Sequence, residues 1–187
     1  MTRLLLVRHA RPAGSWDASS DPPLDDVGRE QAQAMAARLA DRGPLPVVTS
    51  PLQRARETAA PLASQWGREA RVLDEVGEIP SPTTDLAERG AWLRHVLMQC
   101  WGDVDDVLRS WRDRLLDVLT RFEHDTVVVT HYVAINVAVG AATGDDRLAS
   151  CMPQHASVTE LDVDRDGRLT VVSFDDPSAD PRVDSPM

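Results

Sequence analysis

Residues 4–9 read Leu-Leu-Leu-Val-Arg-His, four apolar residues followed at once by an arginine and a histidine. A short apolar run of this kind is typical of a strand that is buried on both faces of a parallel sheet. Two later segments repeat the pattern, since residues 46–50 (PVVTS) lead to Arg54 and residues 126–130 (TVVVT) lead directly to His131. Each of these three predicted strands therefore delivers polar side chains at its carboxyl end.

Helical patterns separate the strands. Asp25 is well placed to cap a helix that Gly43 ends, and Pro51 suits the first turn of a second helix that runs to about Trp66. A third, clearly amphipathic helix carries one row of apolar side chains: Val104, Val107, Leu108, Trp111, Leu115, Val118, Leu119 and Phe122.

The remaining segments complete an α/β pattern. A short strand is expected around Val72, and small residues over 132–142 predict a further helix. Residues 157–164 and 168–174 alternate around an Asp-Gly turn, which indicates a β-hairpin. Strands that alternate with helices predict a three-layer α/β fold, with a mainly parallel sheet covered by helices on both faces and an antiparallel edge hairpin.

Length and composition limit the domain organisation. With 187 residues, of which 42% are hydrophobic, the chain can bury one proper core. We expect one catalytic domain over residues 1–175, within which the less regular segment 77–103 forms a substrate-rim insert. The tail over 176–187 is rich in Pro, Asp and Ser, so we expect it to be flexible.

The charge balance excludes several classes of partner. A formal net charge of −10, with basic residues that form no runs, disfavours binding to nucleic acid or to an anionic membrane surface. The sequence shows no secretory h-region, and no apolar run approaches the ~20 residues that span a bilayer. The cysteines Cys100 and Cys151 lack metal-ligand spacing and suit packing thiols in a reducing compartment, so we expect a cytoplasmic protein.

The polar residues at the strand ends suit phosphate chemistry. Ligands of open α/β sheets bind outside the carboxyl ends of the strands, where Arg8, His9, Arg54 and His131 can converge. Guanidinium groups donate in a bidentate manner to phosphoryl oxygens, and adjacent positive charge lowers the pKa of an imidazole, which keeps it neutral and nucleophilic. Transfer to an imidazole also requires a nearby carboxylic acid to protonate the leaving oxygen.

Four segments resemble a known family. Residues 7–10 (VRHA) are similar to the Arg-His-Gly signature of the histidine phosphatase superfamily, which includes the phosphoglycerate mutases and related phosphatases. Residues 24–32 (LDDVGREQA), 49–59 (TSPLQRARETA) and 128–131 (VVTH) resemble later motifs of that family. The matches occur in family order and extend from residue 4 to about 160, which makes the set far more specific than any one motif.

The resemblance implies roles for particular residues. It implies that His9 becomes a phosphohistidine during the reaction and that the proton donor is Glu78, with Glu75 as the competing candidate. Three other side chains would complete the phosphate pocket: Arg8, Arg54 and His131.

Departures from the family pattern bear on the substrate. Ala10 replaces the usual glycine, and Tyr132 stands where glycine commonly follows the second histidine. Ser15 occupies a position that is often asparagine in the family, and its hydroxyl is our candidate for an additional phosphate donor. The segment 78–82 (EIPSP) lacks the Gly-x-Trp-Glu-Gly run of many members, so the substrate class cannot be inherited.

These observations favour a metal-independent phosphatase that hydrolyses a small phosphate monoester through a phosphohistidine, with no metal and no cofactor. A phosphoglycerate mutase-type phosphotransferase is one alternative, although mutases of the family are generally longer. A non-catalytic module that binds a phosphorylated ligand is another. The natural substrate and the oligomeric state are left open by the sequence.

Several other residues have plain structural interpretations. We expect Glu57 to be a solvated helix residue and Arg56 to point away from the pocket. His95 and His124 are interpreted as surface positions. His155, just ahead of the last hairpin, is left open as a residue near the pocket.

Overall fold

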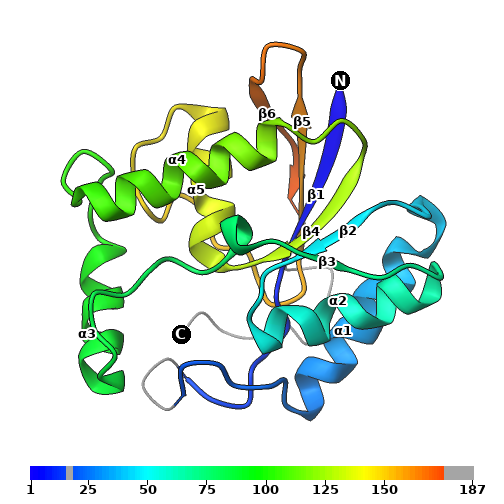
Figure 1. Cartoon of the computed structure of the whole chain (residues 1–187), viewed down its shortest axis with the longest axis horizontal. Coiled ribbons are helices and arrows are strands. Elements are labelled where there is room, and N and C mark those ends of the chain that lie inside the picture. The colour runs from blue at the N-terminus through cyan, green and yellow to red at the C-terminus, as the bar shows by residue number, and fades with distance from the viewer. Residues whose placement is uncertain (16–18, 175–187) are drawn as a thin grey trace.

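A six-stranded sheet forms the centre of the protein, whose computed structural model describes residues 1–15 and 19–174 (Figure 1). The strand order is β3-β2-β4-β1-β5-β6. The first four strands of this order run parallel, and the last two pair antiparallel at the edge next to β1. The strands are β1 (Thr2–Arg8), β2 (Val47–Thr49), β3 (Arg71–Val72), β4 (Thr126–Thr130), β5 (Val158–Val163) and β6 (Leu169–Phe174).

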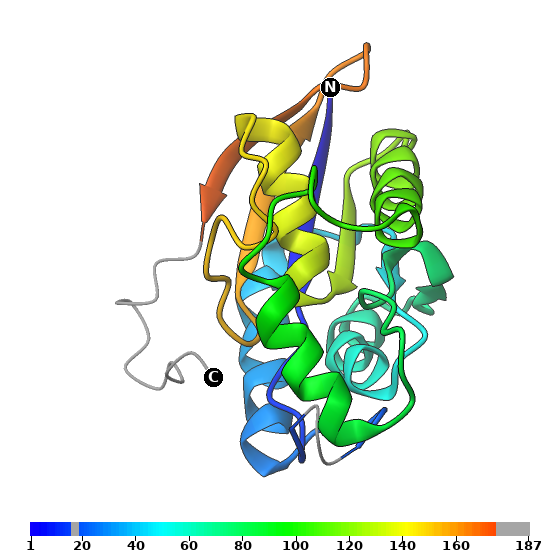
Figure 2. The ribbon, with the colours of Figure 1, turned by 90° about the vertical axis from the view of Figure 1, so that its left-hand side faces the viewer.

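Helices cover both faces of this sheet (Figures 1 and 2). The helices are α1 (Asp26–Leu39), α2 (Gln53–Gln65), α3 (Leu86–Val96), α4 (Asp106–Thr120) and α5 (Tyr132–Thr143). Along β1, Leu5 and Val7 pack into a core with α1 and α2, whereas Leu4 and Leu6 pack into a second core with α4 and α5. The predicted three-layer architecture is therefore confirmed, because successive side chains of a strand point to opposite faces.

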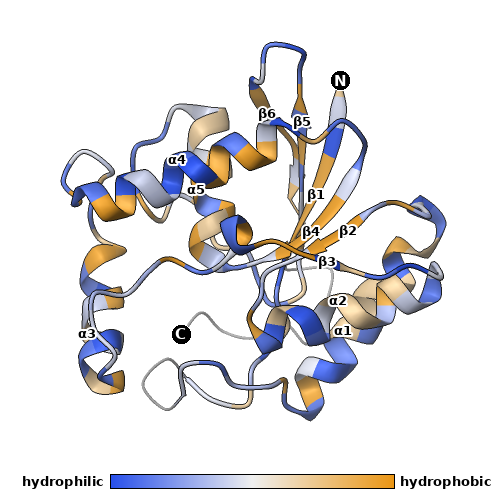
Figure 3. Cartoon of the chain, in the orientation of Figure 1, coloured by the Kyte–Doolittle hydropathy of each residue, from blue (hydrophilic) through white to orange (hydrophobic). Residues whose placement is uncertain are grey.

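Hydropathy follows this layering. The middle of the central strands is hydrophobic, whereas α4 alternates hydrophobic and hydrophilic residues (Figure 3). Over the part of the chain that the structure describes, none of the helices is long and apolar enough to pass through a bilayer.

Two local predictions about the helices were wrong. The second helix begins at Gln53 rather than at Pro51, because the carboxylate of Asp21 accepts a hydrogen bond from the Gln53 N–H at 2.8 Å and supplies the cap from a distant loop. Val107 is 63% exposed instead of buried. Its neighbour Leu108 occupies the core row, and one helical position rotates a side chain by about 100° away from that row.

The start of α1 is packed tightly against the loop that follows β1. The Asp25 carboxylate caps the helix by accepting the Gly28 N–H at 2.7 Å, and it also pairs with the Arg11 guanidinium at 2.7 Å. A Cβ atom on Gly28 would lie 2.0 Å from the Arg11 carbonyl oxygen, so only glycine permits this approach. The contact places the loop beside the carboxyl ends of the strands.

Candidate active site

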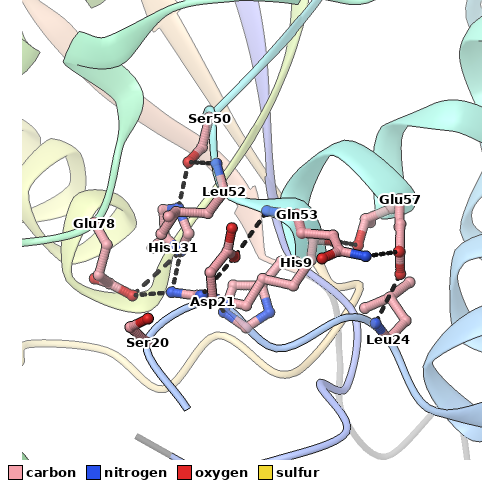
Figure 4. Close-up of polar contacts among 12 residues, drawn as sticks. His9, Ser20, Asp21, Leu24, Ser50, Leu52, Gln53, Glu57, Glu78 and His131 are labelled. Atoms are coloured by element: carbon pink, nitrogen blue, oxygen red, sulfur yellow. Dashed lines mark hydrogen bonds and ion pairs between the residues drawn. The ribbon is translucent and has the colours of Figure 1, made fainter. Parts of the chain in front are cut away.

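A cavity of about 300 Å³ lies at the carboxyl ends of the parallel strands. The loop after β1, the start of α2, the segment before α3, α3 itself, the start of α5 and the segment before β5 all contribute to its wall. The side chains that matter most for its chemistry are Arg8, His9, Arg54, Glu78, Tyr132 and His155. His131 is fully buried next to this lining, with its ring 5.2 Å from that of His9 (Figure 4).

His9 is held in one tautomer. Its Nδ1 lies 2.9 Å from the Ala10 carbonyl oxygen, and because a carbonyl can only accept, Nδ1 carries the proton. The lone pair on Nε2 is therefore available, and it accepts a hydrogen bond from Nε of Arg54 at 3.3 Å. Burial, followed by electrostatic repulsion between a protonated His9 and His131, Arg54 and Arg8, holds the pKa of His9 well below its ordinary value. His9 is thus neutral and presents Nε2, the form that can attack phosphorus.

His131 directly precedes α5 and is bonded at both ring nitrogens. Its Nδ1 lies 3.2 Å from Oε2 of Glu78, and its Nε2 lies 2.7 Å from Oγ of Ser50. Because the Glu78 carboxylate is ionised and can only accept, we assign the proton to Nδ1, while the Ser50 hydroxyl donates to Nε2. Ser50 Oγ in turn accepts the Leu52 N–H at 3.2 Å. Burial lowers the pKa of His131, although Glu78 opposes that shift.

Glu78 lies inside the site, whereas the competing candidate Glu75 is exposed on the surface. Burial alone would raise the pKa of Glu78, but attraction to His131, a hydrogen bond from that ring and the charge of Arg54 lower it to about 2. The Ile79 N–H adds a hydrogen bond to the carboxylate at 3.1 Å. A buried, ionised carboxylate therefore lies next to both Arg54 and His131.

Arg54 links the charged groups of the site. Its side chain is 3% exposed, and its guanidinium lies 3.5 Å from the Glu78 carboxylate and 3.6 Å from that of Asp21. Nη2 also lies 3.5 Å from Nδ1 of His131. Asp21, Glu78 and His131, which Figure 4 shows near His9, therefore hold the guanidinium from several directions.

A threonine fastens the loop that carries His9 to α2. Thr58 Oγ1 accepts the Ala10 N–H at 2.9 Å and donates to the Arg54 carbonyl at 2.7 Å. Thr58 is fully buried, so these two bonds are shielded from water. The backbone that carries His9 and the backbone that carries Arg54 are therefore joined directly through one hydroxyl.

Arg8 approaches the cavity from another direction. Its Nη1 donates to the Pro153 carbonyl at 2.9 Å, and its guanidinium lies over the Tyr132 ring, 5.3 Å from the ring centroid. Tyr132 and Ser15 both line the cavity. That Arg8 and Ser15 donate to a bound phosphate stays a prediction.

Sequence reasoning missed or misplaced several residues of this region. Glu57 is not merely solvated, since its carboxylate accepts the Leu24 N–H and the Gln53 side-chain N–H, both at 2.7 Å, and so fixes the loop before α1. His155, which the sequence left open, lines the cavity. His95, His124 and Arg56 are exposed, as predicted.

The rim of the cavity includes part of the segment 77–103. Arg89, Leu93 and Leu97 from α3 and the residue after it line the wall beyond Glu78. Since Leu93 and Leu97 give this part of the wall an apolar surface, they are candidates for contacts with an organic group. The role of 77–103 as a substrate rim stays a prediction, and residues 176–187 lie outside the described part of the chain.

The two histidines and the glutamate of the site also meet a simple distance criterion for a metal site. One ligand atom from each of His9, Glu78 and His131 can be chosen so that all lie within 4.8 Å of one another. The Arg54 guanidinium, however, lies 3.3 Å from Nε2 of His9 and 3.5 Å from the Glu78 carboxylate. A cation bound there would meet this fixed positive charge, so the arrangement favours an anion.

Comparison with known proteins identifies the fold and its family. Residues 4–176 match the histidine phosphatase superfamily (branch 1). The chain belongs to the histidine phosphatase superfamily. The resemblance seen in the four sequence motifs is thereby confirmed, and the superfamily fold accounts for the convergence of the strand ends on one cavity.

Individual relatives share only part of their sequence with this chain. A bifunctional protein of Mycobacterium tuberculosis is 32% identical over 166 residues, which cover 76% of this chain and 46% of that protein. The chain thus spans about half the length of such curated relatives. A glucosyl-3-phosphoglycerate phosphatase of Mycolicibacterium vanbaalenii is 44% identical over 70 residues, 35% of this chain and 31% of that protein.

A solved structure shares the whole fold. A phosphoserine phosphatase variant from Entamoeba histolytica, in complex with phosphoserine, superposes with a TM-score of 0.73 at 20% sequence identity. The match covers 93% of this chain and 96% of that one. At this identity the likeness shows that the two chains share a fold, and it says nothing about the substrate of this chain.

Proposed function

We propose that the chain is a phosphatase that hydrolyses a small phosphate monoester through a phosphohistidine on His9. The observation that carries the proposal is the neutral His9 Nε2, whose lone pair faces a buried guanidinium next to a second histidine and a carboxylate. Membership of the superfamily supports it, as do the relatives that are named phosphatases. The partner is then a small phosphorylated molecule.

In the first step the phosphoryl oxygens take hydrogen bonds from Arg8, Arg54 and His131. Nε2 of His9 attacks phosphorus while the P–O bond to the leaving oxygen breaks, and Glu78 protonates that oxygen. The Arg54 guanidinium, which contacts His9 and Glu78 in the free protein, then donates to the phosphoryl group instead. Nδ1 of His9 keeps its proton and donates a hydrogen bond to the Ala10 carbonyl, so the positive charge that develops on the ring is stabilised there.

In the second step a water molecule replaces the departed alcohol. Glu78, now ionised, takes a proton from this water as its oxygen attacks phosphorus, and the N–P bond breaks. Inorganic phosphate leaves and His9 returns to its neutral form with the proton on Nδ1. The Ser50 bond keeps His131 pointing its Nδ1–H into the site throughout.

The source of the first proton follows from the electrostatics. Glu78 is ionised in the structure, with its pKa lowered to about 2, so it must gain a proton when substrate binds. A phosphate monoester loses its second proton with a pKa of about 6, so its monoanion can deliver this proton itself. The bound phosphate then raises the pKa of Glu78 by like-charge repulsion. We expect kcat/KM for alkyl esters to rise as the pH falls from 8 to 6, because the fraction of substrate present as the monoanion rises while His9 stays neutral.

The test is to trap the phosphoenzyme. Wild-type protein mixed with a labelled monoester and quenched in alkali should carry acid-labile label on His9, and His9→Asn should carry none and lose turnover. Arg56→Ala, at an exposed position of α2, is the matched control and should behave as wild type. Wild-type turnover in His9→Asn would overturn the proposal.

Glu78→Gln separates an enzyme from a binding module. Hydrolysis of an alkyl phosphate, whose leaving group needs a proton, should fall by roughly 10²- to 10⁴-fold. Hydrolysis of an aryl phosphate with a good leaving group should fall much less. Equal losses for the two esters would argue against Glu78 as the proton donor. Release of phosphate without an isomerised product separates a phosphatase from a mutase.

The remaining parts of the proposal concern metals and location. We propose that catalysis needs no metal and no cofactor, so a chelator should leave kcat unchanged. Added Zn²⁺ should not raise kcat, because the Arg54 guanidinium disfavours a cation beside His9 and Glu78. Activation by Zn²⁺ after chelation would contradict this. The free, half-buried thiols of Cys100 and Cys151 are compatible with the cytoplasmic location that we propose.

A further inference from the structure

His155 lies close to the nucleophile but has no part in the mechanism above. Its ring centroid is 5.7 Å from that of His9, compared with 5.2 Å for His131, and the two rings are tilted by 42°. Unlike His131, it lines the cavity directly. A second imidazole therefore stands nearly as near to His9 as the one that the superfamily motif supplies.

The segment that carries His155 is firmly anchored to the core. Asn136, which is fully buried in α5, accepts the N–H groups of Ser150 and Cys151 at 2.7 and 2.8 Å. Its own amide donates to the Tyr132 carbonyl at 3.0 Å. Together with the bond from Arg8 to the carbonyl of Pro153, these contacts fix the backbone on the approach to His155.

The residue after His155 has an unusual backbone conformation. Ala156 has a φ of +56°, and it is buried. Its N–H donates to the Arg8 carbonyl at 3.0 Å, and its carbonyl accepts from Nη2 of Arg38 at 2.7 Å. A left-handed conformation costs an alanine about 1–2 kcal/mol. Such strain persists where surrounding contacts impose it and is concentrated at functional sites. Here it sets the direction in which the chain presents His155.

We propose that His155 donates a ring N–H to an oxygen of the transferring phosphoryl group, as a third imidazole of the site. The inference rests on the proposed function. The nitrogens of an imidazole lie on the rim of the ring, so a ring at this distance can reach an oxygen on phosphorus that is bound to Nε2 of His9. The apolar wall of the cavity, formed by Leu93, Leu97 and Val133, suits the organic part of the substrate instead.

Three variants and two readouts test this contact. We would measure kcat/KM for an aryl and an alkyl phosphate, and the dissociation constant of inorganic phosphate by calorimetry. His155→Ala should lower kcat/KM for both esters by about ten- to a hundredfold, as expected for a lost hydrogen bond to a charged group. Phosphate should bind at least several-fold more weakly. His155→Gln, which keeps an N–H donor, should recover part of the loss, and His155→Phe should recover none.

The control is His124→Ala, which removes an exposed histidine and should change neither readout. Thermal melting of each variant checks that the segment has not unfolded. Full activity in His155→Phe, unchanged phosphate binding in His155→Ala, or a loss confined to one ester would each overturn the inference. Phosphate binding is measured without turnover, so its result stands apart from the phosphoenzyme trap on His9 that tests the proposed function.

Discussion

The two sides of His9 are built in different ways. On the His131 side, defined by Ser50, Arg54, Glu78 and His131, the side chains are at most 6% exposed and bond to one another. On the His155 side, defined by Arg8, Tyr132, Pro153 and His155, three of the four residues are half-buried, and Arg8 contacts a backbone carbonyl and an aromatic face.

This difference indicates that the site is preorganised mainly on the His131 side. The His131 side holds its charges in fixed geometry with water excluded, and fixed dipoles and charges stabilise a transition state without reorganising. The His155 side leaves its side chains partly open to the cavity, where substrate enters. Substitutions on the His131 side should therefore lower the rate of the chemical step most, whereas those on the His155 side should lower it less and also weaken phosphate binding.

The largest effect is expected for Arg54→Ala. Arg54 touches both the nucleophile and Glu78, so its loss removes a fixed donor from the transition state and should lower kcat/KM by about 10³-fold. Without the guanidinium the pKa of Glu78 should rise, which NMR titration of that carboxyl can detect. Arg56→Ala on the same helix is the control. A loss smaller than tenfold would mean that the His131 side does not stabilise the charge of the transition state.

Much of the His131 side could be predicted from the sequence. His9 and His131 follow apolar runs directly, and Arg54 follows one by a short turn, so parallel pairing alone brings them to one edge of the sheet. Thr126 to Thr130 pairs with Leu4 to Arg8 residue by residue, which aligns the two histidines. Glu78 was found only through the resemblance, because nothing in its local pattern distinguishes it from Glu75.

The His155 side could not be predicted in the same way. The position of His155 depends on the amide of Asn136 some twenty residues earlier and on the left-handed turn at Ala156. Alanine gives no sequence signal for a positive φ, since glycine or asparagine is the usual residue there. The cap that Asp21 supplies to α2 was missed for a similar reason, because it joins residues 32 positions apart.

A tenfold effect is expected for Ser50→Ala, which sharpens the comparison within the His131 side. Ser50 touches no substrate atom in the proposed mechanism, and it acts by holding the proton of His131 on Nδ1. Its loss should lower kcat more than it raises KM, and Ser50→Cys, which keeps a weak donor, should restore part of the loss. Ser64→Ala at an exposed position of α2 is the control. An effect on KM alone would point to an altered cavity instead.

Stability against pH tests whether the interior beside His9 is dry. The pKa of His9 is lowered in the folded state, so below its unfolded value of about 6.5 only the unfolded chain binds this proton. Folding stability should therefore fall as the pH drops from 6.5 to 5, by up to about 1.4 kcal/mol per unit for this group. His131 acts in the same direction.

In His9→Asn the amide can keep the bond to the Ala10 carbonyl, but it does not titrate. Urea unfolding at pH 7 and pH 5 should therefore show a smaller difference for the variant than for the wild type. Glu78 adds a separate loss at lower pH, below its ordinary value of 4.5 and towards its folded value of about 2. Equal differences in wild type and variant between pH 7 and 5 would show that His9 is hydrated.

The smallest effect is expected on the His155 side, at Ala156. Glycine adopts a φ of +56° without the strain that alanine bears, but it also gains entropy in the unfolded chain, so Ala156→Gly should change the free energy of unfolding by less than about 1 kcal/mol, in the stabilising direction. Ala34→Gly, in the middle of α1, is the matched change at an ordinary helical φ and should cost about 1 kcal/mol. Urea unfolding measures both. If the two glycines destabilise equally, Ala156 is not strained, and the turn that presents His155 would need another explanation. If instead Ala156→Gly stabilises the fold, Ala34→Gly destabilises it and activity is retained, then alanine is strained at position 156. The hydrogen bonds of Ala156 with Arg8 and Arg38 then hold the turn in that conformation in the wild type.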